Sequence, residues 1–211
     1  DKGGILWGDQ LLILFGREIL SRKPGATIIS EVKSSKTLFD DIAKHGGKPI
    51  MWKTGHSLIK EKMRETQAAV AGEMSGHVFF SDRYFGYDDA IYASCRLLEI
   101  ISKSEKPLSE MLSDVPKMYS TPEIRTDCPE HMKFEVVKEL TRHFKENGFD
   151  VVDIDGARVT FDDGWGLVRA SNTQPVLVLR FEATSKERLA EIKELIEGQL
   201  RKVLEEKGAK T

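Results

Sequence analysis

The first half of the chain alternates short β-branched segments with amphipathic segments of helical spacing, and this alternation restricts the possible folds more than any other feature. Strand patterns occur at 26–32, 49–52, 68–71 and 78–80, and helical patterns at 9–21, 35–45, 56–66 and 88–102. Asp9 is the expected cap of the first helix. Strands that alternate with helices are typical of a layered α/β domain. We therefore predict an α/β domain in which a mixed sheet is layered with helices.

The pattern changes at 116–122, where two prolines stand among Ser and Thr residues and indicate a linker. Beyond it, the final helix is expected to start at a Thr184-Ser185-Lys186-Glu187 capping box. Strand patterns occupy 123–126, 151–154, 158–161, 167–170 and 176–181, and a further helical pattern occupies 129–146. These patterns predict an α+β domain with two helices and a mostly antiparallel four-stranded sheet. The expected domain bounds are 1–117 and 118–211.

Composition excludes several classes of protein. The 211 residues include 32 Lys and Arg and 34 Asp and Glu, so the formal charge of −2 gives no overall attraction to nucleic acid or to an anionic membrane. No apolar run approaches the roughly 20 residues of a membrane span, and the first residues lack the apolar core of a signal peptide. The two cysteines, Cys95 and Cys128, form neither a disulfide framework nor a CxxC pair. We expect a cytoplasmic protein with reduced thiols and no nucleic-acid or membrane partner.

The chain begins with Asp1-Lys2-Gly3-Gly4, which is typical of a tight hairpin turn because adjacent glycines accept positive φ. Residues 5–7 fit the outgoing strand, and no sequence precedes the turn to form the incoming one. We interpret 1–5 as the remnant of a preceding domain and the chain as the C-terminal piece of a longer protein. A processed or trimmed N-terminus is the alternative interpretation.

A polar loop in the second half has the composition of an anion-binding site. It reads Arg169-Ala170-Ser171-Asn172-Thr173-Gln174-Pro175, and Arg180 follows on the next predicted strand. Side-chain hydroxyl and amide groups supply donors, and a turn here is expected to expose successive backbone N–H groups. Guanidinium groups bind phosphate oxygens in pairs, so Arg169 and Arg180 would complete the cradle. An ordinary polar hairpin turn with two solvated arginines is the alternative.

A second loop follows a predicted strand and reads Gly72-Glu73-Met74-Ser75-Gly76-His77. Glycines at both ends allow sharp turns and a close approach of the backbone to a ligand. Glu73 and Ser75 are two residues apart, so in an extended backbone their side chains would face the same side and could clamp two neighbouring sugar hydroxyls. His77 adds a proton donor. A loop or bulge with surface polar groups is the alternative.

The third motif, Lys53-Thr54-Gly55-His56, also lies at the end of a strand and opens a helix, whose N-terminus would favour phosphate. Lys33 ends the preceding strand on the same edge of the sheet. His56 could hold or move a proton near neutral pH, although a lone histidine is more often a cap or a packing residue. Asp88-Asp89 is expected to cap a helix, and no metal-ligand spacing such as HExxH occurs, so no metal site is expected in this chain.

Taken in their order along the chain, the three motifs resemble the α-D-phosphohexomutase superfamily, and within it the bacterial phosphomannomutase/phosphoglucomutase branch. The resemblance extends from about Ile5 to the C-terminal helix. Members of the superfamily have four domains, and this chain resembles the third and the fourth. The resemblance therefore implies that the phosphoserine loop of domain one and the Mg²⁺ loop of domain two lie outside this chain.

The resemblance also implies residue roles. Lys33, His56 and His77 are the implied catalytic candidates, close to the reacting groups. The implied substrate-binding residues are Lys33, Lys53, His56, Glu73, Met74, Ser75, Gly76, His77, Arg169, Ala170, Ser171, Asn172, Thr173 and Arg180. Of these, the loop around Glu73 would bind the sugar hydroxyls, and the loop around Ser171 would bind the phosphate that is not transferred.

The activity implied for the intact protein is reversible phosphoryl transfer between hexose 1-phosphate and hexose 6-phosphate. It would proceed through a phosphoserine and a glucose or mannose 1,6-bisphosphate, with Mg²⁺ offsetting the developing charge. The implied partners are hexose phosphates and the N-terminal domains of the same protein, and this chain alone should bind substrate weakly without turnover.

A stand-alone module that senses a sugar phosphate stays open as an alternative. An RNA-binding second half is disfavoured by the lack of aromatic stacking pairs. The motifs do not separate mannose from glucose.

Overall fold

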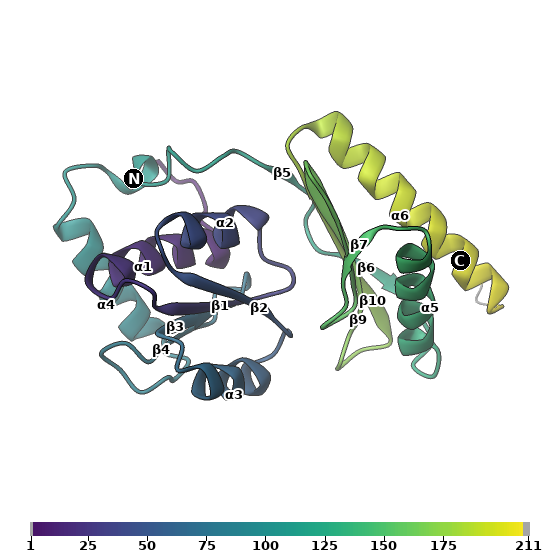
Figure 1. The fold of residues 1–211 in the computed structure, drawn as a ribbon, viewed down its shortest axis with the longest axis horizontal. Coiled ribbons are helices and arrows are strands. Elements are labelled where there is room, and N and C mark those ends of the chain that lie inside the picture. Colours follow the sequence, from purple (N-terminus) through teal and green to yellow (C-terminus); the bar gives the residue numbers. More distant parts are fainter. Residues whose placement is uncertain (1, 209–211) are drawn as a thin grey trace. The chain divides into compact units, whose positions relative to one another are not determined.

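The computed structural model describes residues 2–208, and these divide between Pro116 and Lys117 into two compact units (Figure 1). Among the described residues, no helix is both long enough and apolar enough to cross a membrane. Both cysteines are free thiols, with Cys95 exposed and Cys128 buried. Each unit has its own core and is described by itself.

The first unit is a mixed sheet layered with helices, as the alternating pattern predicted. The strand order is β2-β1-β3-β4, with β1 parallel to both of its neighbours and β4 antiparallel to β3. The elements are α1 (Gly8–Arg22), β1 (Thr27–Glu31), α2 (Lys36–Lys44), β2 (Lys48–Trp52), α3 (His56–Thr66), β3 (Val70–Gly72), β4 (Val78–Phe80), α4 (Ala90–Ser102) and the 3-10 turn η1 (Leu108–Glu110).

Helices cover both faces of this sheet, because successive side chains of its strands alternate between the two faces. On β1, Ile28 packs into a cluster with α1, α2 and α4, while Ile29 packs into a second cluster with α3. On β4, Phe80 belongs to the first cluster and Phe79 to the second. Figure 1 shows α2 and α3 on opposite sides of the sheet. The ends of the strands, rather than their faces, are therefore the places where polar side chains can meet a ligand.

Two expectations for the N-terminal segment are wrong. Residues 5–7 form no strand, contrary to the first expectation. The expected hairpin turn stays a prediction, because it includes Asp1, which lies outside the described residues. The N-cap of α1 is Trp7 rather than Asp9. The buried Asp9 carboxylate instead accepts hydrogen bonds from the backbone of Gln10, at 2.9 Å, and of Ser35, at 3.0 Å. Asp9 therefore ties the start of α1 to the loop that follows β1.

The second unit is an antiparallel sheet with two helices on one face. The strand order is β5-β10-β9-β8-β7, and β6 also pairs with β10. The predicted antiparallel sheet is confirmed, but four strands were too few, because β5 and β6 pair with opposite ends of β10. The elements are β5 (Tyr119–Ser120), β6 (Ile124–Asp127), α5 (Lys133–Glu146), β7 (Asp150–Val152), β8 (Ala157–Phe161), β9 (Gly164–Ala170), β10 (Val176–Ala183) and α6 (Lys186–Glu206).

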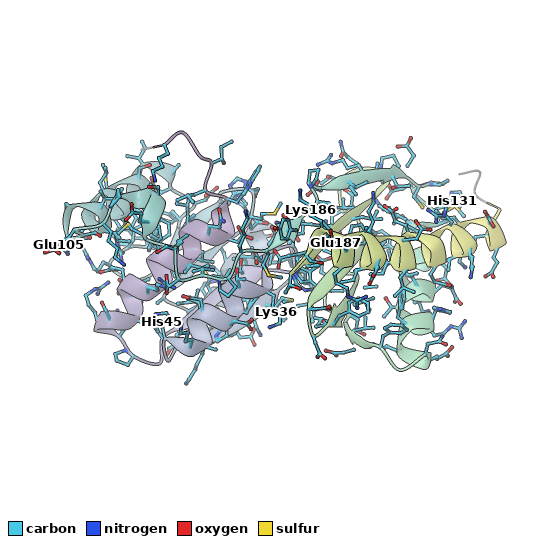
Figure 2. The ribbon with its side chains drawn as sticks, turned by 90° about the horizontal axis from the view of Figure 1, so that it is seen from above. Lys36, His45, Glu105, His131, Lys186 and Glu187 are labelled. Carbon is cyan, nitrogen blue, oxygen red and sulfur yellow. The ribbon has the colours of Figure 1, made fainter. Side chains whose placement is uncertain are left out.

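The core of the second unit lies between the sheet and the paired helices α5 and α6 (Figure 1). Along β9, Val168 and Ala170 point into this core, so Leu167 and Arg169 lie on the opposite face. Figure 2 shows Lys186 and Glu187 in the first turn of α6. The N-cap is Ser185, whose hydroxyl accepts the N–H of Arg188 at 3.1 Å, so the capping box expected at Thr184 is one residue out of place.

Candidate functional site

The ends of three parallel strands lie side by side in the first unit. The register pairs Glu31 with Trp52 and Ser30 with Gly72, so the residues that follow β1, β2 and β3 emerge at one edge of the sheet. Lys33, Lys53, His56 and Glu73 all follow these strand ends. The edge is therefore the place where four sequence-predicted residues come together. Ligands bind at this edge in open α/β sheets.

Glu31 is the centre of this edge, and sequence analysis missed it. Its fully buried carboxylate accepts hydrogen bonds from Thr54 Oγ1, at 2.6 Å, and from the backbone N–H of Met74, at 3.1 Å. The buried Lys33 ammonium lies 3.5 Å from Oε1 of Glu31. Burial raises the pKa of Glu31 above its usual range, and the charge of Lys33 opposes that rise. One carboxylate thus connects the loops that follow all three parallel strands.

The loop that joins β3 to β4 is a tight turn rather than an extended segment. The N–H of Gly76 donates to the carbonyl of Glu73 at 3.0 Å, and the N–H of Glu73 donates to the carbonyl of His77 at 2.9 Å. Gly76 has φ +102°, a conformation that a side chain would strain. Glu73 is consequently buried while Ser75 is exposed. The expectation that these two side chains face the same side is wrong, because it assumed extended backbone.

The Glu73 side chain points back to the start of α3. Its Oε1 accepts the backbone N–H of Gly55, the N-cap residue of α3, at 3.0 Å. A phosphate was the anion expected at this helix N-terminus, whereas in the structure the anion next to it is the carboxylate of Glu73. The Gly55 N–H is therefore already paired, and Glu73 is held rigidly at the mouth of the loop.

Gly8 supports the same loop from the opposite side and was also missed. Its N–H donates to the carbonyl of Met74 at 3.2 Å. A Cβ at position 8 would lie 2.1 Å from the Glu73 carbonyl oxygen and 2.9 Å from the Gly76 nitrogen. Only glycine allows the first turn of α1 to approach the loop this closely. The signal in the sequence was a glycine at the first position of a helix, which is weak evidence by itself.

His56 and His77 come together beside one acidic residue. Their rings are edge to face with centroids 4.3 Å apart. Oδ2 of Asp88 lies 2.8 Å from Nδ1 of His77 and 3.1 Å from Nε2 of His56. The expected capping role is correct for Asp89, which accepts the N–H of Tyr92 at 2.9 Å, and wrong for Asp88.

The same histidines belong to the one group in the described chain whose members suit a metal ion. Ligand atoms of His56, Glu73 and His77 all lie within 4.8 Å of one another. Two imidazoles and one carboxylate are typical ligands of zinc-like transition ions rather than of Mg²⁺, which prefers oxygen. No spacing in the sequence predicts this group, because its members come from two separate loops.

The polar loop of the second unit connects β9 to β10 and is organised around Ser171. The Ser171 hydroxyl oxygen accepts the backbone N–H groups of Thr173, at 3.3 Å, and of Gln174, at 3.2 Å. The expectation that the turn exposes successive N–H groups is therefore wrong for these two positions. Asn172 and Thr173 are exposed, and the Ser171 hydroxyl can still donate its own hydrogen. The donors that this loop offers are mainly side-chain groups.

Residues outside the motif hold this loop in place. The fully buried Lys133, at the start of α5, donates to the carbonyl of Gln174 at 3.0 Å and to Glu130 at 2.8 Å. Arg125 donates to Oε1 of Gln174 at 2.7 Å, and the N–H of Cys128 donates to the carbonyl of Pro175 at 2.9 Å. Sequence analysis found none of these supports, since they join segments far apart in the chain.

Arg169 and Arg180 lie on the same face of the sheet, as expected for the hairpin. The register pairs Arg169 with Val178, next to the loop, and Arg180 with Leu167, further away from it. Nε of Arg169 donates to Asp155 at 3.0 Å, and Nη2 donates to the other oxygen at 3.3 Å. The Arg169 fork is therefore oriented by an acidic residue that sequence analysis assigned only to a turn. The side chain of Ala170 lies in the core, so a contact from this residue would come from its backbone.

Comparison with known proteins identifies two matching family regions. Residues 7–119 match the family described as phosphoglucomutase/phosphomannomutase, alpha/beta/alpha domain III. Residues 123–199 match the family described as phosphoglucomutase/phosphomannomutase, C-terminal domain. The two matched ranges fall within the two units of the structure, apart from three residues at the junction.

Named relatives agree with this match. The phosphomannomutase/phosphoglucomutase of Pseudomonas aeruginosa is 50% identical over 203 residues, which cover 96% of this chain and 44% of the relative. A phosphoglucomutase of Neisseria gonorrhoeae is 51% identical over 186 residues, covering 87% of this chain and 40% of the relative. The chain therefore spans less than half the length of these curated relatives.

Solved structures show the same relationship. A phosphoglucomutase/phosphomannomutase family protein from Burkholderia thailandensis superposes with a TM-score of 0.84 at 48% identity, over 96% of this chain and 42% of that chain. An N-acetylphosphoglucosamine mutase of Aspergillus fumigatus, solved with GlcNAc-6P and magnesium, superposes with a TM-score of 0.66 at 16% identity, over 96% and 46%. At that identity the second likeness concerns the fold alone.

Proposed function

This chain belongs to the phosphoglucomutase/phosphomannomutase family, and on that premise we propose that it forms the substrate-binding part of an enzyme that interconverts hexose 1-phosphates and hexose 6-phosphates. The observation that supports the proposal best is the pair of rigid polar loops, one in each unit. Each loop is fixed by buried groups, Glu31 in the first unit and Lys133 in the second. Rigid positioning of polar groups is what recognition of a small polar ligand requires.

We assign phosphate binding to the loop of the second unit. Nε and Nη2 of Arg169 already donate to Asp155, so the Nη1 end of its guanidinium is the part that we assign to phosphate. Ser171, Asn172 and Thr173 supply side-chain donors. Arg180 adds a second positive charge on the same face. Asp155 orients the Arg169 fork, so little side-chain entropy is lost when phosphate binds.

We assign sugar recognition to the loop of the first unit. Glu73 is the buried acceptor for sugar hydroxyls, and its orientation is set by the Gly55 N–H. The exposed Ser75 supplies a hydroxyl from the same turn. Met74 and Gly76 can add their carbonyl oxygens as acceptors, because the N–H groups of both residues are already paired. The exposed Lys53 adds positive charge at the neighbouring strand end.

We assign proton handling to His77 and His56, with Lys33 as a nearby charge. An imidazole exchanges protons near neutral pH, and phosphoryl transfer to a sugar hydroxyl releases a proton. His77 lies directly at the end of the sugar loop. Lys33 is buried against Glu31 and so is held at the same edge of the sheet.

The remaining parts of the reaction are assigned to the portion of the protein that this chain does not span. A phosphoserine would exchange its phosphoryl group with the sugar phosphate through a glucose or mannose 1,6-bisphosphate. Mg²⁺, when bound, would offset the charge that develops during transfer. The nitrogen-rich group of His56, Glu73 and His77 does not suit Mg²⁺, so we place that ion outside this chain.

Calorimetric titration of the chain tests the proposal. We expect mannose 1-phosphate, glucose 1-phosphate and glucose 6-phosphate each to bind more tightly than mannose, glucose or inorganic phosphate, because a sugar phosphate carries both the hydroxyl groups and the phosphate group to which polar loops of this chain are assigned. The same samples should show no mutase turnover. Equal affinity for sugar phosphate and for inorganic phosphate would contradict the sugar assignment, and no binding of any of these ligands would contradict the proposal as a whole.

A further inference from the structure

We propose that Asp88 is a positioning residue that fixes the proton on Nδ1 of His77, and so leaves Nε2 of that ring bare for the ligand. The functional consequence rests on the proposed mutase function, while the proton placement rests on this structure alone.

The geometry singles out one carboxylate oxygen. Nδ1 of His77 and Oδ2 of Asp88 form a hydrogen bond of 2.8 Å, whereas Nε2 of His56 makes only an ion-pair contact with the same oxygen, at 3.1 Å. An ionised carboxylate only accepts hydrogen bonds, so Nδ1 of His77 must carry a proton to pair with it. In a neutral imidazole the other nitrogen is then an acceptor. His77 is thereby assigned a bare Nε2.

The backbone explains why Asp88 is held in this place. Asp88 forms an isolated antiparallel bridge with Phe79, two residues after His77, so the segment before α4 returns alongside β4. The next residue, Asp89, caps α4 and accepts the hydroxyl of Tyr84 at 2.6 Å. The two adjacent carboxylates therefore have separate tasks, since one starts the helix and the other contacts the histidines.

The consequence differs for the two rings. For His77 the proton is placed on Nδ1, which is the less favoured position for a histidine ring in water. The hydrogen bond to Asp88 is therefore needed to stabilise this tautomer. His56 makes only an ion-pair contact with this carboxylate, so Asp88 does not select its tautomer. A carboxylate that holds a histidine in one tautomer decides which ring nitrogen is left to accept a hydrogen bond. Removing Asp88 should therefore change His77 much more than His56.

Long-range ¹⁵N–¹H spectra of the histidine rings test the inference. They are recorded at about pH 8.5, about two pH units above the ordinary pKa of a free imidazole, and with a chelator to remove metal ions. The unchanged chain should show a protonated Nδ1 and a bare Nε2 for His77. Asp88→Ala should move the His77 proton to Nε2, and Asp88→Glu should restore it in part. Asp89→Asn is the matched control, because asparagine caps helices as well as aspartate and should leave both rings unchanged.

Two results would overturn the inference: a His77 proton on Nε2 in the unchanged chain, or a His77 spectrum that Asp88→Ala does not alter although backbone amide spectra show an intact fold. Neither result changes the outcome of the sugar-phosphate titration, so the proposed function is tested separately. In a protein with the full length of the relatives, Asp88→Ala should lower kcat by at most the roughly 10²- to 10⁴-fold that general acid–base catalysis contributes, with a smaller change in KM.

Discussion

The carboxylate of Glu31 accepts the backbone N–H of Met74 at 3.1 Å, and this bond joins residues 43 positions apart. The same carboxylate accepts the hydroxyl of Thr54. A single buried acid therefore sets the relative positions of two loops that carry candidate ligand-binding residues. An acid buried this deeply is costly, and its retention is explained if the precision of the loops matters more than stability.

Glu31→Gln should separate the charge of this residue from its hydrogen bonds. The amide can still accept the N–H of Met74 and can donate to the Thr54 hydroxyl, so the loops should stay ordered. Burial raises the pKa of Glu31 in the folded state, so its contribution to stability is full below its ordinary pKa and falls as pH rises through the raised value. Chemical denaturation between pH 4 and 8 should therefore show a flatter pH dependence for Glu31→Gln than for the unchanged protein.

Glu31→Ala is the companion variant for that measurement. It leaves the Met74 N–H and the Thr54 hydroxyl without this acceptor, so unfolding should become easier by about 1–3 kcal/mol at every pH. Equal pH dependence of stability in the unchanged protein and in Glu31→Gln would contradict the assignment of a raised pKa.

Gly8→Ala should destabilise the protein although alanine is the better helix former. The new Cβ would lie 2.1 Å from the Glu73 carbonyl oxygen, so α1 and the sugar loop must move apart. We expect a loss of about 1–3 kcal/mol in the free energy of unfolding, together with weaker binding of sugar phosphates. Gly198→Ala in α6 is the control, because its nearest contact is 3.7 Å away and the substitution should stabilise by about 0.5–1 kcal/mol. The same sign for both variants would contradict the close approach.

Asp82 should make the first unit sensitive to acid. Burial alone would raise the pKa of its carboxyl group, but ion pairs with Lys23 and Arg22 outweigh burial and lower the pKa to about 2. A lowered pKa gives stability that is present above the ordinary value of 3.8 and is lost as pH falls through 2. The loss should amount to about 2 kcal/mol between pH 4 and 2.

Asp82→Asn should remove most of that acid dependence and should also lower stability at neutral pH, because the buried Arg96 guanidinium lies 3.2 Å from the same carboxylate. Urea denaturation at several pH values measures both effects. Asp40→Asn is the control, since Asp40 pairs with Lys36 at the exposed surface and should change stability by less than about 1 kcal/mol. An unchanged acid dependence in Asp82→Asn would show that other carboxylates cause it.

Arg169→Lys should weaken the binding of sugar phosphates by about tenfold or more and leave the fold intact. Lysine keeps the charge but cannot reproduce a guanidinium fork that Asp155 orients through two hydrogen bonds. Calorimetry with glucose 1-phosphate measures the change. Arg142→Lys, on the exposed face of α5, is the matched control and should leave affinity unchanged. Unchanged affinity in Arg169→Lys would mean that charge, rather than the shape of the guanidinium, determines binding.

The fold was largely predictable from periodicity, whereas the contacts of the site were not. The bounds of α3 and β4 match the predicted segments, because apolar spacing is a local property of the chain. The inward orientation of Glu73 was not predictable, since it depends on a turn that forms only when α1, α3 and the loop pack together. The partners of Asp88 depend in the same way on a segment that folds back along β4.

In the second unit too, the fold was predictable from the sequence and the contacts that hold the site were not. The antiparallel hairpins followed from alternation and from turn residues, and they correctly placed Arg169 and Arg180 on one face. The bond from Lys133 to the loop links residues 41 positions apart, and a lysine within a predicted helix gives no sign of burial. Sequence therefore identified which loops carry polar groups, and the structure identified what holds those loops rigid.

An NMR titration of the chain with mannose 1-phosphate and glucose 1-phosphate tests the central claim most directly. We predict that amide shifts cluster at residues 73–77 and 169–173, that Arg169→Ala abolishes the second cluster, and that Glu73→Ala abolishes the first. If neither loop responds at millimolar ligand, or if the shifts fall on other segments, the assignment of these loops to sugar and phosphate binding is wrong.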